Sequence, residues 1–179
     1  MRALRVRFCL SVLTVCAATA LSSAYAAPTC QDLIDDFTEA FETAESFIST
    51  TTVTTDGGRE LAFVRARLSR DASGELQQEI LEQRGRRPPE GGGENDDGEF
   101  SFDCEGHALT PFQGGRYLLV LQEDNPDIPV SGYRLRFRTD GERYLPTELS
   151  SDFSVRIVLV PVRGTFTSEF ESWVLPGAE

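Results

Sequence analysis

The sequence predicts an α+β protein, mainly antiparallel β, in which one N-terminal amphipathic helix covers a curved sheet or an unclosed half-barrel. Three observations support this fold class. An apolar stripe with helical spacing runs through residues 33–48. After residue 49 the period changes to two, in segments rich in β-branched and aromatic residues. The chain has 179 residues, 40% of them hydrophobic, which suits a single domain with one core.

The first 26 residues have the three parts of a secretory signal peptide. The positive part contains three arginines, Arg2, Arg5 and Arg7. An apolar stretch over residues 8–21 follows, and Ala24 and Ala26 supply the small residues required at positions −3 and −1. We therefore expect cleavage after Ala26, export to the periplasm and one mature domain over residues 27–179. The apolar stretch is short for a membrane span, so we expect no stable membrane insertion after cleavage.

Two cysteines remain once the leader is removed, Cys30 and Cys104. An even pair in an oxidising compartment predicts one disulfide. The bridge would close a loop of about 75 residues and would stabilise the fold by roughly 4 kcal/mol on the chain-entropy model. A redox-active pair is the alternative, but these cysteines lack the close Cys-x-x-Cys spacing of such sites.

The predicted helix begins after Thr29, which with Asp32 resembles a capping box. Its apolar positions recur every three or four residues: Leu33, Phe37, Ala40, Phe41, Ala44 and Phe47 or Ile48. Acidic residues occupy the other face, which is typical of a solvated helix surface. The stripe must be buried, so the helix is expected to lie on one face of the sheet.

About nine strands follow at the spacing of an antiparallel meander. We expect them over residues 50–55, 61–69, 76–84, 100–104, 116–123, 132–139, 142–149, 153–162 and 164–174. Turn residues separate them, at 56–58, 71–74, 150–152 and 163–164 among others. The segment 76–84 also fits a helix, but the turn before it favours a hairpin. Residues 85–99 are a low-complexity, glycine-rich and acidic stretch that predicts a disordered loop.

Charge and the inventory of reactive side chains exclude several classes of function. The formal net charge is −12 and every basic residue is arginine, so nonspecific binding to nucleic acid or to anionic headgroups is disfavoured. His107 is the sole histidine, and no nucleophile-elbow sequence lies near it. With both cysteines in a bridge, one nitrogen ligand is too few for zinc. The acids around Gly98 do not match an EF-hand loop, which leaves a less regular calcium site in this acidic loop as the alternative. We expect no enzyme activity, metal or cofactor.

Arginines alternate with apolar residues along residues 132–139. Arg134, Arg136 and Arg138 form one row, and Arg65 and Arg67 form a second. The rows could meet an acidic partner or a lipid phosphate. Cross-strand charge pairs with Glu169 and Glu171 are the favoured interpretation.

The other face of the same strands is apolar and supplies the candidate ligand-binding residues. These are Tyr133, Leu135, Phe137, Phe153, Val155, Ile157, Phe166 and Phe170. They could be ordinary core beneath the helix. A curved sheet covered by a single helix could also leave a cleft that accepts acyl chains or an apolar peptide.

The order of elements resembles the LolA/LolB-like periplasmic lipoprotein-carrier superfamily. Residues 63–74 (FVRARLSRDASG) are similar to its early hairpin, and residues 130–137 (VSGYRLRF) with 140–147 (DGERYLPT) look like its later strands. The resemblance spans roughly residues 29–175 and implies an unclosed β-barrel that binds acyl chains in its hollow. This chain shows no second helical block to serve as a lid.

The sequence thus favours an exported, periplasmic, non-catalytic protein with an apolar cleft for a lipid or a lipoprotein acyl chain. The alternative is an envelope protein that binds another envelope protein through its surface, with a filled core and no small-molecule site.

Overall fold

The structure is a computed structural model that describes residues 27–85, 102–122, 130–157 and 160–177. These residues form one helix, α1 (Cys30–Thr43), and a single antiparallel sheet. The strands are β1 (Ser46–Thr55), β2 (Glu60–Arg70), β3 (Leu76–Gly85), β4 (Ala108–Phe112), β5 (Arg116–Gln122), β6 (Gly132–Thr139), β7 (Tyr144–Ile157) and β8 (Val160–Val174). The predicted signal peptide and nearly all of the predicted loop over 85–99 lie outside the described residues.

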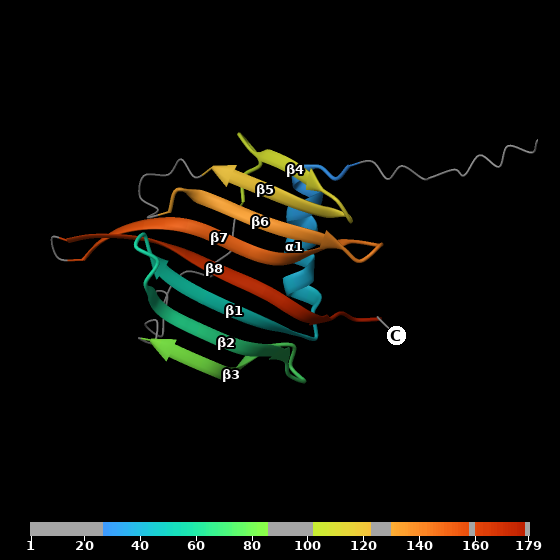
Figure 1. Cartoon of the computed structure of the whole chain (residues 1–179). Coiled ribbons are helices and arrows are strands. Elements are labelled where there is room, and N and C mark those ends of the chain that lie inside the picture. Colours follow the sequence, from blue (N-terminus) through green and yellow to red (C-terminus); the bar gives the residue numbers. More distant parts are fainter. Residues whose placement is uncertain (1–26, 86–101, 123–129, 158–159, 178–179) are drawn as a thin grey trace, which may run out of the picture.

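The sheet has the strand order β3-β2-β1-β8-β7-β6-β5-β4, so that the last strand of the chain joins two meanders. Figure 1 shows a twisted sheet with α1 running across its strands on one side, here called the inner face. The predicted mainly antiparallel fold with one helix on an unclosed sheet is therefore confirmed. The sheet is open rather than a barrel, because β3 and β4 stand at its two edges.

The helix begins as the sequence predicts and ends earlier. Thr29 and Asp32 form a reciprocal capping box, with the Thr29 Oγ1 accepting from the Asp32 backbone N–H. The helix stops at Thr43, and Phe47 already belongs to β1. Its last carbonyls are satisfied from the sheet, since the Arg70 guanidinium donates to the carbonyls of Phe41 and Ala44.

Two predicted turns lie inside strands, so the three strands expected over 142–174 are two long ones. Residues 150–152 are polar, but they are satisfied across the sheet. The Ser151 hydroxyl donates to the Gly132 carbonyl, and Asp152 accepts from the Thr165 hydroxyl at 2.7 Å. Hydrogen bonds of this kind offset the cost of removing polar groups from water, so these residues are compatible with a strand.

Gly164 is a strand glycine rather than a turn residue. A side chain at this position would run into the Thr54 carbonyl and the ring of Phe153, its cross-strand neighbour on β7. The ring of Phe153 thus occupies the space that the glycine leaves.

The first half of the sheet otherwise follows the prediction. The 76–84 segment is the edge strand β3, not a helix, and both predicted turns before it close hairpins. In the middle of the chain the prediction is wrong. Residues 102–104 are not a strand, and β4 was not predicted.

The core lies between α1 and the strands that it crosses. Leu33, Ile34 and Phe37 of the helix pack on five leucine and phenylalanine residues of β5, β6 and β7: Leu119, Leu121, Leu135, Phe137 and Leu149. The predicted disulfide between Cys30 and Cys104 joins the start of the helix to the segment before β4.

Candidate binding surfaces

The predicted apolar face divides into a covered part and an uncovered part. Leu135 and Phe137 of β6 are 0% and 1% exposed and pack beneath α1. Tyr133, Phe166 and Phe170 are half-buried and contact the same core. Leu135, Phe137, Tyr133 and Phe170 fill the space under the helix, and Phe166 lies between this core and the uncovered part.

The helix is too small to cover the inner face. Fourteen residues make a helix about 21 Å long and roughly 10 Å wide. Eight strands at about 4.8 Å spacing span about 34 Å, and β7 and β8, with 14 and 15 residues, are each close to 50 Å long. Figure 1 shows α1 at the end of the sheet where β1 begins and β8 ends. The opposite end of the inner face has no helix or strand over it among the described residues.

This opposite end, the distal inner face, is mainly apolar. It comprises Thr51 and Val53 of β1, Val64 of β2, Phe153 and Val155 of β7, and Phe166 and Ser168 of β8. All seven side chains are half-buried. The two hydroxyls bond to each other, because the Thr51 Oγ1 and Ser168 Oγ atoms lie 2.8 Å apart. Their mutual hydrogen bond leaves a surface with little demand for polar partners. The side chain of Ile157, a further predicted site residue, lies outside the described side chains.

The outer face of the sheet carries the predicted arginine rows, and most of their members form ion pairs. Arg65 pairs with Glu171 at 2.6 Å, which confirms one predicted partner. The β6 arginines pair instead with β7, which lies between β6 and β8: Arg134 with Asp152 at 3.0 Å, and Arg136 with Glu148 at 3.1 Å. The Thr165 hydroxyl and the Arg134 guanidinium hold the pKa of Asp152 below its ordinary value.

A hollow of about 590 Å³ opens beside the β4–β5 hairpin. It is lined by Phe112, Gln113, Arg116, Tyr117, Arg136, Phe137, Arg138 and Thr147. The sequence pointed to Arg136 and Arg138 but missed Phe112, Arg116 and Thr147. Arg116 stands directly opposite Arg138 in the β5–β6 register, and this juxtaposition is invisible without the strand pairing.

Two further titratable groups, His107 and Asp36, form hydrogen bonds with the backbone. His107 is exposed, and its Nδ1 lies 2.6 Å from the Cys104 carbonyl oxygen. Burial raises the pKa of Asp36, whose carboxylate accepts from the Tyr144 backbone N–H and so ties α1 to β7. The described part of the chain holds no cluster of His, Cys, Asp and Glu residues that could bind a metal.

None of the described helices is long and apolar enough to cross a membrane. Comparisons of the chain with protein-family models, with curated proteins and with solved structures gave no match.

Proposed function

We propose that the chain is an exported, periplasmic, non-catalytic binding protein whose distal inner face receives the acyl chain of a lipid or lipoprotein. The observation that carries the proposal is the mismatch between a short helix and a long sheet. Apolar side chains such as Val53, Val64 and Phe153 remain half-buried on a face that ordinarily requires a cover.

Export is the second part of the proposal. The predicted leader over residues 1–26 and the bridge between Cys30 and Cys104 are both typical of a protein that folds in an oxidising compartment. Mass spectrometry of the protein recovered from the periplasm should give a mature chain that begins at Ala27. A chain that retains the leader would contradict cleavage.

Acyl binding is tested by titration of the purified mature protein with a fluorescent fatty acid. The informative variant is Val53→Gln, and Thr52→Gln is its matched control, because the neighbouring residue of β1 points to the outer face. Losing the apolar contact of one valine should weaken uptake about tenfold. Thr52→Gln should bind as the parent does. Neither substitution adds charge, so repulsion of the anionic probe does not enter the comparison.

Folding is controlled by the urea midpoint and near-ultraviolet circular dichroism of each variant. No uptake by the folded parent, or equal uptake by the two variants, would refute the acyl-chain proposal. If Val53→Gln does not fold, Val64→Gln tests the same surface from β2.

An envelope interaction module remains a second proposal, and the packing under α1 favours it. Leu135 and Phe137 are completely enclosed there, so this part of the inner face is filled core. Native mass spectrometry of protein taken directly from the periplasm separates the two proposals. A co-purifying lipid supports the first, and a stoichiometric protein partner without lipid supports the second.

A further inference from the structure

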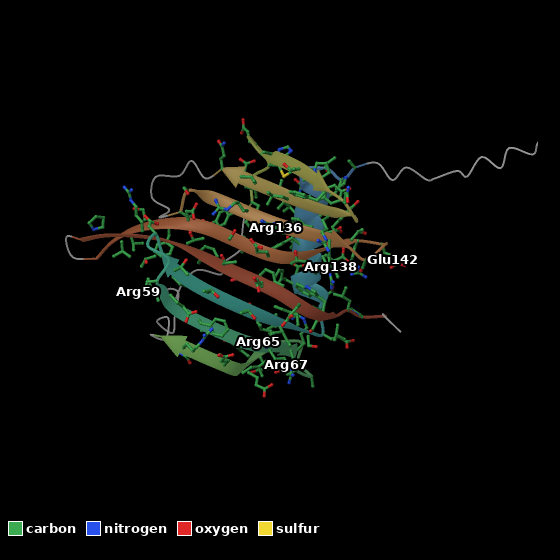
Figure 2. All side chains as sticks on the ribbon, viewed as in Figure 1. Arg59, Arg65, Arg67, Arg136, Arg138 and Glu142 are labelled. Carbon is green, nitrogen blue, oxygen red and sulfur yellow. A yellow bond between two sulfur atoms is a disulfide. The ribbon has the colours of Figure 1, made fainter. Side chains whose placement is uncertain are left out.

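The hollow beside the β4–β5 hairpin gathers positive charge in a protein whose formal net charge is −12. Arg116 of β5 and Arg138 of β6 are register partners, and Arg136 is two residues further along β6. Figure 2 shows Arg136 and Arg138 along β6. The strand alternation places them opposite in direction to Leu135 and Phe137, which point to α1. The cluster is therefore on the outer face, separated by the sheet from the distal inner face.

Two of these three charges have no counter-charge within the described part of the chain. Arg136 pairs with Glu148, whereas Arg116 and Arg138 form no ion pair with any residue that the structure describes. Like charges directly opposite each other on neighbouring strands repel. Elsewhere on this face, arginines such as Arg65 and Arg134 have carboxylates within 3.0 Å. At the hollow, two arginines instead lie side by side without a described carboxylate partner, and this excess of positive charge attracts an anion.

The hollow also offers an apolar surface beside the charges. Phe112 ends β4 opposite Arg116 and is 51% exposed, which is unusual for a phenylalanine. The Thr147 hydroxyl already donates to the Arg136 carbonyl at 3.1 Å and so helps to hold β6 and β7 together at the rim. A volume of about 590 Å³ is within the range of small-molecule sites.

We propose that this hollow binds a small phosphate monoester whose alcohol part is aromatic or apolar. The phosphate carries a charge of about −1.5 to −2 at neutral pH, which matches the two uncompensated guanidinium groups of Arg116 and Arg138. Guanidinium groups donate in pairs to phosphate oxygens. The ring of Phe112 packs against the apolar part of the ligand. The site needs no contact with the acyl surface and stands or falls independently of it.

Phenyl phosphate is the test ligand, and inorganic phosphate and phenol are its two halves. Isothermal titration of the mature protein at low salt should show binding of phenyl phosphate, weaker binding of inorganic phosphate and none of phenol. Arg116→Gln and Arg138→Gln should each weaken phenyl phosphate binding at least about tenfold, the loss expected for one charge-assisted contact. Arg59→Gln is the matched control, because Arg59 is exposed, lies in the β1–β2 connection and does not line the hollow (Figure 2). It should bind as the parent does.

Phe112→Ala tests the apolar half of the site. It should lower the affinity for phenyl phosphate to that for inorganic phosphate and leave inorganic phosphate binding unchanged. Absence of phenyl phosphate binding at millimolar concentration would overturn the proposal. Equal losses of phenyl phosphate affinity in Arg138→Gln and Arg59→Gln would also overturn it. They would indicate that the anion is attracted by positive charge spread over the surface and not bound in the hollow.

A lipid headgroup is the other source of a phosphate monoester, and vesicles with and without phosphatidic acid distinguish it. If the protein sediments with phosphatidic acid vesicles but does not bind phenyl phosphate, the small-ligand proposal is wrong. Because the Arg variants are surface changes, circular dichroism should show the parent fold. If one of them fails to fold, the other tests the site.

Discussion

Removal of the Cys30–Cys104 bridge should lower the free energy of unfolding more than any of the single substitutions discussed below. The bridge joins positions 74 apart in the chain. On the chain-entropy model, closing a loop of this size lowers the conformational entropy of the unfolded state. This stabilises the folded protein by about 4.5 kcal/mol at 25 °C. The whole stability of such domains is about 5–15 kcal/mol. The expected loss is therefore between about 30% and about 90% of the total.

The suitable variant replaces both cysteines, Cys30→Ala with Cys104→Ala, and leaves no free thiol. Alanine is chosen because Cys30 is buried, and a serine hydroxyl there would add the separate penalty of an unpaired polar group. Urea unfolding of the oxidised parent and of the double variant gives the comparison. With a slope near 2 kcal/mol per molar urea, the midpoint should fall by about 2 M.

Reduction supplies an internal control for this measurement. A parent treated with dithiothreitol should unfold close to the double variant, and the double variant should not respond to the reductant. A midpoint within about 0.5 M of the parent would refute the reasoning, because it corresponds to only about 1 kcal/mol. The start of α1 would then be held by its capping box and core contacts, without need of the bridge.

Three further predictions concern single side chains. Arg70→Ala should lower the free energy of unfolding by about 1–3 kcal/mol, measured in urea, because it strips charge-assisted donors from the carbonyls at the end of α1. Asp152→Asn should lose at most about 1 kcal/mol at pH 7, since this ion pair is partly exposed. The pKa of Asp152 is lowered in the folded state. The stability that its carboxylate contributes is therefore present above the pKa of the unfolded state, near 3.9, and is lost as the pH falls through the pKa of the folded state. The unfolding curves of the parent and of Asp152→Asn should thus converge in acid. Arg138→Gln should raise stability by about 0.2–1 kcal/mol at low salt, and added salt should erase the difference, because it relieves repulsion from Arg116.

Local signals in the sequence predicted the elements that local physics determines. The capping box at Thr29, the helical stripe after it and the hairpin turns before β2 and β3 all depend on residues within four positions of one another. The disulfide followed from the number of cysteines that remain once the predicted leader is removed. These predictions needed no knowledge of which strands are neighbours.

The errors occurred where a distant residue decides the local structure. Gly164 and the polar residues 150–152 are typical of turns, but Phe153, Gly132 and Thr165 make a strand acceptable there. The early end of α1 depends on a guanidinium from β2. The strand β4 contains Pro111, which a sequence pattern disfavours and an edge strand tolerates.

Prediction of the candidate sites from the sequence was limited in the same way. Leu135 and Phe153 look alike in the sequence, because both alternate with polar residues in apolar strands. One is buried under α1 and the other is half-buried beyond it, and only the place where the helix crosses the sheet distinguishes them. Arg138 likewise looked like the paired Arg134 until the register set it against Arg116.

The two candidate sites lie on opposite faces of the sheet. On the inner face, α1 covers Leu135 and Phe137, whereas Val53 and Phe153 at the distal end have no described helix over them. On the outer face, Arg65, Arg134 and Arg136 pair with carboxylates, whereas Arg116 at the hollow faces Arg138. Departures from otherwise consistent local choices are where binding sites are expected. Because the sheet separates the two departures, their ligands should not compete: saturation with phenyl phosphate should leave fatty-acid uptake unchanged. Competition between the two would mean that one site had been misplaced.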